Sequence, residues 1–202
     1  MSVRGVLQIH SAPPALSPHI EWAVAGVFGV PGESPAPLRL HWVDQPAAPG
    51  AIRTELAWQG RVGTAGDLAS ALANWQLLRF EVTEDASQGC DAVRYSCTPG
   101  LGLFAATVSA NGDIMISENR LRAAITLAAS ASTPGNGRVH LAASDGEQLG
   151  TLRELHGPRH PALGGSLEEE LALLLGDAWD AELEPFRHAS AGAPVRWLHA
   201  TG

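Results

Sequence analysis

The chain begins with an alternation of apolar and polar residues and then changes to a helical pattern. Residues 4–10 alternate with a period of two, which predicts a half-buried strand. Residues 17–28 instead space their apolar side chains three or four positions apart, which predicts an amphipathic helix. Ser17 stands where an N-cap is expected, Pro18 at the first helical position and Gly29 at the exit.

The same two patterns continue through the first half of the chain. Residues 38–45 and 52–59 predict two strands joined by a turn-rich segment. Residues 64–75 predict a second helix capped by Thr64, and residues 77–82 predict a further strand. The resulting order, β-α-β-β-α-β, is that of the ferredoxin-like fold, which packs both helices on one face of an antiparallel sheet. The predicted fold class is therefore α+β.

The second half of the chain is less regular. We expect two strands, a hairpin turn, two helices and a terminal strand or arm, at residues 92–97, 103–110, Asn111-Gly112, 117–129, 166 onward and 194–200. The last helix opens with a capping box, in which Ser166 is followed by Glu169. Residues 130–165 are rich in Gly, Pro, Ser and Ala without an apolar period, which predicts a mobile insert.

Length and composition fit one α+β domain, with a ferredoxin-like portion over about residues 1–84 and a second portion over about residues 90–202. Hydrophobic residues make up 45% of the 202 positions, enough to bury a core. The net charge of −8, with acids and bases interspersed, argues against a nucleic-acid backbone as the main partner. The sequence has neither a membrane-length apolar run nor a signal-peptide pattern, so we expect a cytoplasmic protein without a membrane segment.

The lack of lysine and the lack of a zinc-binding cysteine pattern exclude several kinds of catalytic and metal site. The sequence has no lysine, which removes Schiff-base chemistry and the lysine of a P-loop. The spacing of Cys90 and Cys97 matches no zinc-binding pattern, and we expect both to be free thiols. A single disulfide between them is the alternative. We therefore expect no metal and no cofactor.

The strongest candidate site is a surface of the predicted sheet. If the apolar residue at each alternate position faces the helices, the opposite face carries several basic residues together with Gln8, Glu55 and Glu81. Arginine binds carboxylates and phosphates with two parallel hydrogen bonds, and histidine can add a donor. The pattern therefore predicts an anion site that comprises His10, Arg39, His41, Arg53 and Arg79.

Other interpretations of that face remain open. Cross-strand Arg–Glu pairs are an ordinary way to solvate an exposed sheet, and the second half of the chain can also pack there. An enzyme of unrecognised type would use His10, His41 and Arg79, or Cys97 as a nucleophile. No nucleophile motif supports this alternative, and a cysteine beside a tyrosine is more often a packing residue.

The C-terminal segment forms a second candidate surface. The pattern predicts an irregular segment over residues 182–197, flanked by two tryptophans. Its aromatic and basic residues either clasp the domain or dock a protein partner, and the candidates are Trp179, Phe186, Arg187, Arg196 and Trp197. The tryptophans of the first half are expected in the core: Trp22, Trp42, Trp58 and Trp75.

Six stretches carry a family resemblance: RGVLQIHSAPPALSPHIEWAVAGVFG, DQPAAPG, WQLLRFEVTED, RYSCTPGLGLF, NGDIMISENRLRAAI and DAELEPFRHASAGAPVRWLH. In these the chain resembles the actinobacterial family of unknown function numbered 3145. The resemblance spans nearly the whole chain apart from residues 30–37 and the insert over about residues 130–165. It implies an actinobacterial cytoplasmic protein, associates the chain loosely with fatty-acid synthesis loci, and assigns no catalytic residue.

These observations favour a non-catalytic binding or regulatory module over an enzyme. The expected partner is another protein or an acidic small molecule, and not a nucleic acid or a membrane.

Overall fold

The computed structural model describes residues 2–29, 34–131 and 166–188. It confirms the α+β class: antiparallel strands form one seven-stranded sheet in the order β2-β3-β1-β4-β5-β6-β7. The strands are β1 (Ser2–Ala12), β2 (Val43–Asp44), β3 (Ile52–Arg61), β4 (Arg79–Glu84), β5 (Ala92–Thr98), β6 (Gly102–Val108) and β7 (Ile114–Met115). The helices are α1 (Ser17–Phe28), α2 (Thr64–Leu72), α3 (Glu118–Ala131), α5 (Leu167–Leu175) and α6 (Asp177–His188), with a short 3-10 turn, η1 (Pro14–Leu16), before α1.

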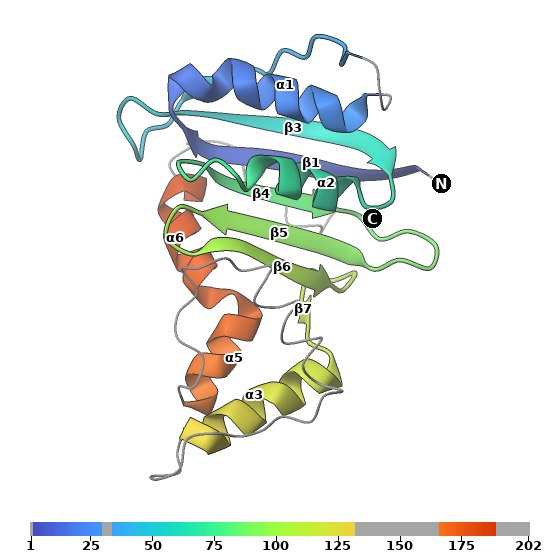
Figure 1. Cartoon of the computed structure of the whole chain (residues 1–202), viewed down its shortest axis with the longest axis vertical. Coiled ribbons are helices and arrows are strands. Elements are labelled where there is room, and N and C mark those ends of the chain that lie inside the picture. Colours follow the sequence, from blue (N-terminus) through green and yellow to red (C-terminus); the bar gives the residue numbers. More distant parts are fainter. Residues whose placement is uncertain (1, 30–33, 132–165, 189–202) are drawn as a thin grey trace.

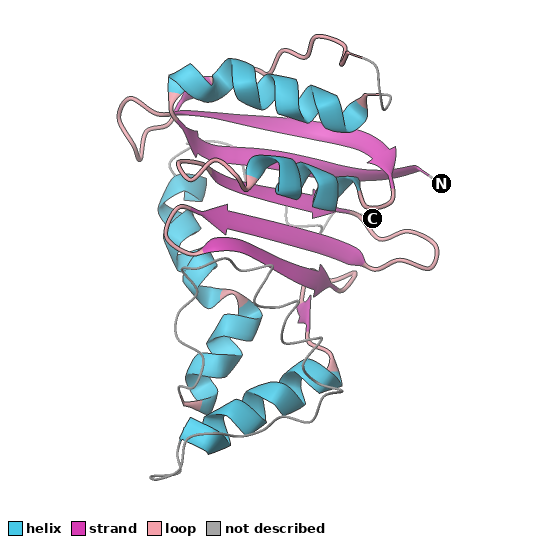
Figure 2. Cartoon of the chain, viewed as in Figure 1, coloured by secondary structure: helices cyan, strands magenta, loops and turns pink. Residues whose placement is uncertain are grey.

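The main core lies between the sheet and the helices α1 and α2, which pack side by side on one face (Figure 1). Leu7, Ile9 and Phe80 point from the sheet into this core, as their alternation predicts. Helix α6 packs against β1 and β5, while α3 packs on α5 below the sheet (Figure 2). The structure shows the order β2-β3-β1-β4 and the two helices α1 and α2 that the ferredoxin-like prediction requires. The assignment of the whole topology to the ferredoxin-like fold stays a prediction.

Position 5 requires a glycine because neighbouring strands come too close to it for a side chain. Its register partner on β3 is Trp58, whose ring lies across the glycine. A Cβ at this position would stand 2.0 Å from the carbonyl oxygen of Thr83 and 2.2 Å from Cζ2 of Trp58. A strand glycine covered by an aromatic residue of the next strand is a known way to stabilise an otherwise weak position.

The predicted strand over residues 38–45 is wrong in extent, because only Val43–Asp44 pair with β3. The carboxylate of the buried Glu21 on α1 accepts hydrogen bonds from the Leu40 amide at 3.0 Å and from Trp42 Nε1 at 3.1 Å. Arg39 adds a third at 3.2 Å. Burial raises the pKa of Glu21, but these hydrogen bonds and the charge of Arg39 outweigh it and lower that pKa. Residues 39–42 are thus bound to α1 through Glu21, while the His41 carbonyl oxygen also accepts a hydrogen bond from the Thr54 hydroxyl of β3.

The helix starts also differ from the prediction. The residue before α1 is Leu16, and Ser17 lies inside the helix with its hydroxyl donating to Pro14 O. Helix α2 is preceded by Gly63 in the left-handed region, at a φ of 90°. Its first amides donate to Glu84 of β4, from Gly63 and Ala65. The capping acceptor therefore comes from a distant strand and not from Thr64.

Residues 182–197 were predicted to be irregular, and this is wrong for residues 182–188, which belong to α6. The helix contains Pro185, and its buried residues recur every four positions as Trp179, Leu183 and Arg187. Because the third member is an arginine, the apolar period is hidden in the sequence. The capping box of Ser166 and Glu169 is confirmed at the start of α5. The predicted insert, from residue 132 on, and the arm over residues 194–200 lie outside the described residues.

Only part of the tryptophan prediction holds. Trp58 is buried, and Trp42 and Trp75 are partly buried against the main core. Trp22 is 69% exposed, so it was wrongly assigned to the core. The α1 stripe that faces the sheet consists of Ile20 and Val24, and Trp22 lies off that stripe.

Candidate functional site

The most polar part of the interior lies on the face of the sheet opposite α1 and α2, and it begins with an irregularity in β1. Ile9 pairs with Phe80, but the next pairing joins Ser11 to Arg79, so β1 has one extra residue at His10. Such a bulge bends a strand and redirects its side chains. Here it accompanies a buried imidazole whose Nε2 lies 2.8 Å from Glu81 Oε2.

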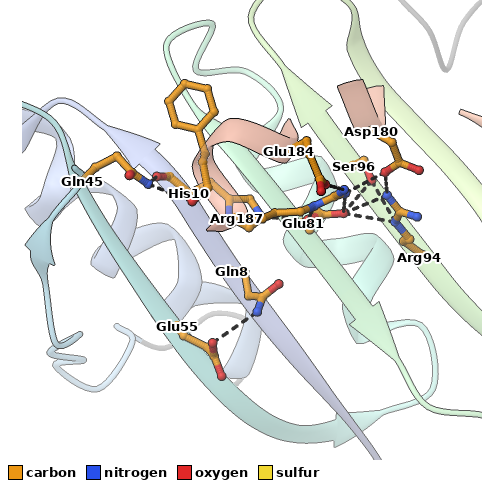
Figure 3. A network of polar contacts seen from close by, with 11 residues as sticks. Gln8, His10, Gln45, Glu55, Glu81, Arg94, Ser96, Asp180, Glu184 and Arg187 are labelled. Atoms are coloured by element: carbon orange, nitrogen blue, oxygen red, sulfur yellow. Dashed lines mark hydrogen bonds and ion pairs between the residues drawn. The ribbon is translucent and has the colours of Figure 1, made fainter. Parts of the chain in front are cut away.

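Glu81 is the centre of a buried network (Figure 3). Arg187 of α6 donates to it through two atoms, from Nε to Oε2 at 2.8 Å and from Nη2 to Oε1 at 2.6 Å. Arg94 of β5 donates from Nε to Oε1 at 3.1 Å, and the Ser96 hydroxyl lies 3.3 Å from the same oxygen. The carboxylate thus meets donors from β1, β5 and α6, which is a dense set of charge-assisted contacts.

Asp180 closes the network on the side of α6. Its Oδ1 accepts from Arg187 Nη2 at 2.7 Å and also contacts Arg94 Nη2. Glu184 lies 3.3 Å from Arg187 Nη1. Both arginines are therefore surrounded by acceptors from the sheet and from the helix, and the network fastens α6 to the sheet.

The pKa values of Glu81 and Arg187 are both shifted in the direction that keeps these groups charged. Burial alone would raise the pKa of Glu81, but hydrogen bonds and charge from His10 and Arg187 lower it far below its ordinary value. Burial alone would lower the pKa of Arg187. The hydrogen bonds and charges of Glu81 and Asp180 together have the larger effect and raise this pKa above its ordinary value. Glu81 is consequently a permanent carboxylate at neutral pH. A group in that state with all its acceptors engaged holds structure and is poorly suited to move protons.

Two further arginines on the same face are arranged differently. Arg53 lies two residues before Glu55, which bonds to Gln8 at 3.2 Å, and Arg79 lies two residues before Glu81. The alternation of β3 and β4 thus puts both on the face of the Glu81 network, on either side of β1. The Nε atoms of both are buried without a hydrogen-bond partner. The Arg79 guanidinium lies over the ring of Phe186, 4.6 Å from its centroid.

The predicted anion-site residues are therefore not all brought together. His10, Arg53 and Arg79 share one face at the β1 bulge. Arg39 is exposed and pairs with Glu21 of α1. His41 is exposed, and its carbonyl oxygen accepts from the Thr54 hydroxyl.

The C-terminal candidates have roles inside the protein where they are described. Trp179 is buried, stacks on Phe104 with ring centroids 5.0 Å apart and donates from Nε1 to Gly102 O. Phe186 supports Arg79, and Arg187 bonds to Glu81. A partner cannot reach Trp179 or Arg187 while α6 stays on the sheet. Arg196 and Trp197 lie outside the described residues.

The family model named Protein of unknown function (DUF3145) matches residues 6–149 and 146–200. This chain belongs to the DUF3145 family. No curated protein and no solved structure matches it. In the parts of this DUF3145 chain that the structure describes, no helix is long and apolar enough to span a membrane.

The thiols of this DUF3145 protein fit an inert role better than a catalytic one. Cys97 of β5 is buried, and burial raises its pKa to about 12. Its thiolate, which is the nucleophilic form, is thus scarce at neutral pH. Cys90 is exposed, and both cysteines are free. Among the described residues no group of His, Cys, Asp and Glu is arranged to hold a metal ion.

The sequence interpretation missed four members of the Glu81 network, which are Arg94, Ser96, Asp180 and Glu184. Arg94 and Ser96 alternate with Tyr95 and Cys97, so the same period-two argument places them on the Glu81 face once β5 is put beside β4. Asp180 and Arg187 are seven positions apart, which is about two helical turns and therefore one side of a helix. That signal depends on recognising α6 as a helix.

Proposed function

We propose that this chain is a non-catalytic binding module that holds an anionic group, a carboxylate or a phosphate, between Arg53 and Arg79. The observation that carries the proposal is that both arginines have a buried Nε without a hydrogen-bond partner. A buried donor without an acceptor costs free energy, about 1–3 kcal/mol. An anion bound between them would satisfy both donors.

The neighbouring arginines provide the contrast. Arg94 and Arg187 meet Glu81 and Asp180, and their charges are used within the fold. Arg53 and Arg79 form no ion pair with any carboxylate of the described residues. In a chain with a net charge of −8, two unpaired arginines on one face favour a specific anion over general attraction to acidic partners.

The spacing supports one shared ligand. Arg53 is on β3 and Arg79 on β4, with β1 between them. Neighbouring strands are about 4.8 Å apart, so the two backbones are about 10 Å apart, which two arginine side chains can bridge around a small anion. The ring of Phe186 fixes the guanidinium of Arg79 and reduces the entropy lost on binding.

The link to fatty-acid synthesis belongs to the same proposal. Carriers of activated acyl groups are phosphorylated, and arginine is well suited to phosphate. Coenzyme A is therefore a suitable second probe beside inorganic phosphate, and citrate tests a carboxylate ligand.

The test is the thermal unfolding of the full chain with each probe, at ionic strength matched with sodium chloride. A ligand that binds only the folded state raises Tm. We expect at least one probe to raise Tm, and Arg53→Gln and Arg79→Gln each to abolish that rise. The matched control is Arg122→Gln, because Arg122 is exposed on α3 and pairs with Glu118. A rise that survives both substitutions, or no rise with any probe, would contradict the proposal.

A further inference from the structure

Strand β3 has an edge that the fold leaves largely without a partner strand (Figure 1). It runs from Ile52 to Arg61, but β2 pairs with it only at Ile52 and Arg53. The cause is Glu21, which binds residues 39–42 to α1 and so keeps them from extending β2 along β3.

The hydrogen-bond parity of β3 shows which groups face this edge. Gln45 N–H donates to Ala51 O, so the odd-numbered residues of β3 direct their backbone groups toward β2. The other side of the sheet agrees: Asp85 N–H donates to Arg4 O, so the even residues of β1 bond to β4 and its odd residues to β3. The odd residues of β3 therefore direct their N–H and C=O groups outward.

Three residues present these groups beyond the end of β2. They are Glu55, Ala57 and Gln59, all exposed, and no backbone hydrogen bond joins them to another residue of the described ranges. A row of unpaired backbone groups on a long strand is a template for pairing with another strand.

We propose that this edge pairs with the same edge of a second copy of the chain, antiparallel and centred on Ala57. The open segment has Ala57 at its middle, with β2 at one end and the end of β3 at Arg61 at the other. In this register Ala57 faces Ala57 of the second copy, and the two β2 strands lie beyond the paired segment on opposite sides.

The side chains are self-complementary in this register. Glu55 lies opposite Gln59 of the second copy, and a carboxylate opposite an amide is the combination that Glu55 already makes with Gln8. Ala57 is small enough to face itself across the twofold axis. Arg53 already pairs with Val43 of β2, so the segment shared with the second copy runs from Glu55 to Gln59. The two sheets would become one continuous sheet with twofold symmetry.

A disulfide across the axis tests the register directly. In the Cys90→Ser background, Ala57→Cys places two thiols opposite each other, at a Cα separation of about 5.5 Å, which a disulfide spans. We expect mild oxidation to give a covalent dimer. Gln59→Cys is the matched control, because it faces Glu55 and not itself, and we expect it to form little dimer. Equal cross-linking of both variants, or none of Ala57→Cys, would overturn the proposal.

A second measurement does not depend on thiols. Ala57→Pro removes only an outward N–H, which the ladder with β1 does not use, and edge strands tolerate proline on that side. Loss of this donor in both copies should weaken the dimer about 30-fold in sedimentation equilibrium. Ala57→Ser keeps the N–H and should leave the dimer unchanged. Monomeric full chain at every concentration, or pairing with a different protein's strand instead, would overturn the proposal.

Discussion

Arg187 and Glu81 are 106 positions apart in the sequence and meet through two hydrogen bonds in the interior of the protein. This pair joins the C-terminal helix to the sheet, and Arg94 and Asp180 reinforce it. It accounts for a C-terminal arginine that composition alone suggests is a surface group.

Removing one partner of this pair should strongly destabilise the fold. Arg187→Ala leaves Glu81 buried with fewer donors, and we expect a loss of about 3–5 kcal/mol in the free energy of unfolding by urea. Glu184→Gln is the control, because Glu184 is 54% exposed in its side chain and its carboxylate lies 3.3 Å from Arg187 Nη1 at the rim of the network. It should cost less than about 1 kcal/mol. Equal losses for both variants would contradict the central role of Glu81.

The pH dependence of stability should carry the signature of Glu81. Its pKa is lower in the folded protein than its ordinary value of 4.5, so the unfolded chain binds the proton more readily. The stabilisation is thus fully present above pH 4.5 and is lost as the pH falls below it. We expect urea midpoints of the wild type to fall more steeply between about pH 5 and 3 than those of Glu81→Gln. Parallel curves would show that Glu81 is not the responsible group.

Two glycines should respond oppositely to alanine. Gly5→Ala puts a methyl group against a carbonyl oxygen that cannot withdraw and should cost about 1–3 kcal/mol. Gly26→Ala meets nothing within 4 Å on the surface of α1 and should stabilise the protein by about 0.5–1 kcal/mol. Chemical denaturation of both variants checks the packing of β1 beneath Trp58. A tolerated Gly5→Ala would contradict that packing.

Glu21 should determine the path of residues 39–42. Glu21→Ala removes the acceptor of the Leu40 amide, whose hydrogen exchange should then lose protection. Arg39→Ala is the control, because Arg39 is exposed and its loss leaves that acceptor in place. Unchanged protection of Leu40 in Glu21→Ala would contradict the explanation for the short β2.

The two thiols should differ in reactivity. A thiol reagent at neutral pH should label Cys90 in the folded protein and should reach Cys97 only in denaturant, since Cys97 is buried and its pKa is raised to about 12. Peptide mapping after labelling distinguishes the two. Labelling of Cys97 at a comparable rate in the folded state would revive its candidacy as a nucleophile.

The sequence predicted those elements whose signal is local. The period-two runs of β1, β3 and β5, the helix α1 and the capping box at Ser166 follow from neighbouring residues alone. The errors have distant causes. Glu21 shortens β2 from another element, and Glu84 caps α2 from a strand that comes later in the chain.

In the candidate site, too, the sequence pattern indicates what is local to one strand and misses what depends on distant elements. Alternation within β3 and β4 places Arg53 and Arg79 on one face of the sheet, and their role as an anion site stays a prediction. Alternation alone cannot show that Arg187 contacts Glu81, because this contact depends on α6 and on the β1 bulge at His10. A buried arginine also reverses the ordinary assumption that charged positions face solvent.

The most direct test of the anion site is the NMR spectrum of the arginine Nε–Hε groups while the full chain is titrated with phosphate, coenzyme A and citrate in turn, where at least one probe should bind. The account predicts that the signals of Arg53 and Arg79 shift together and saturate, because their Nε donors lack partners. The signals of Arg94 and Arg187 should stay in place, since Glu81 already accepts from both. Shifts confined to exposed arginines such as Arg122, or none at Arg53 and Arg79, would contradict it.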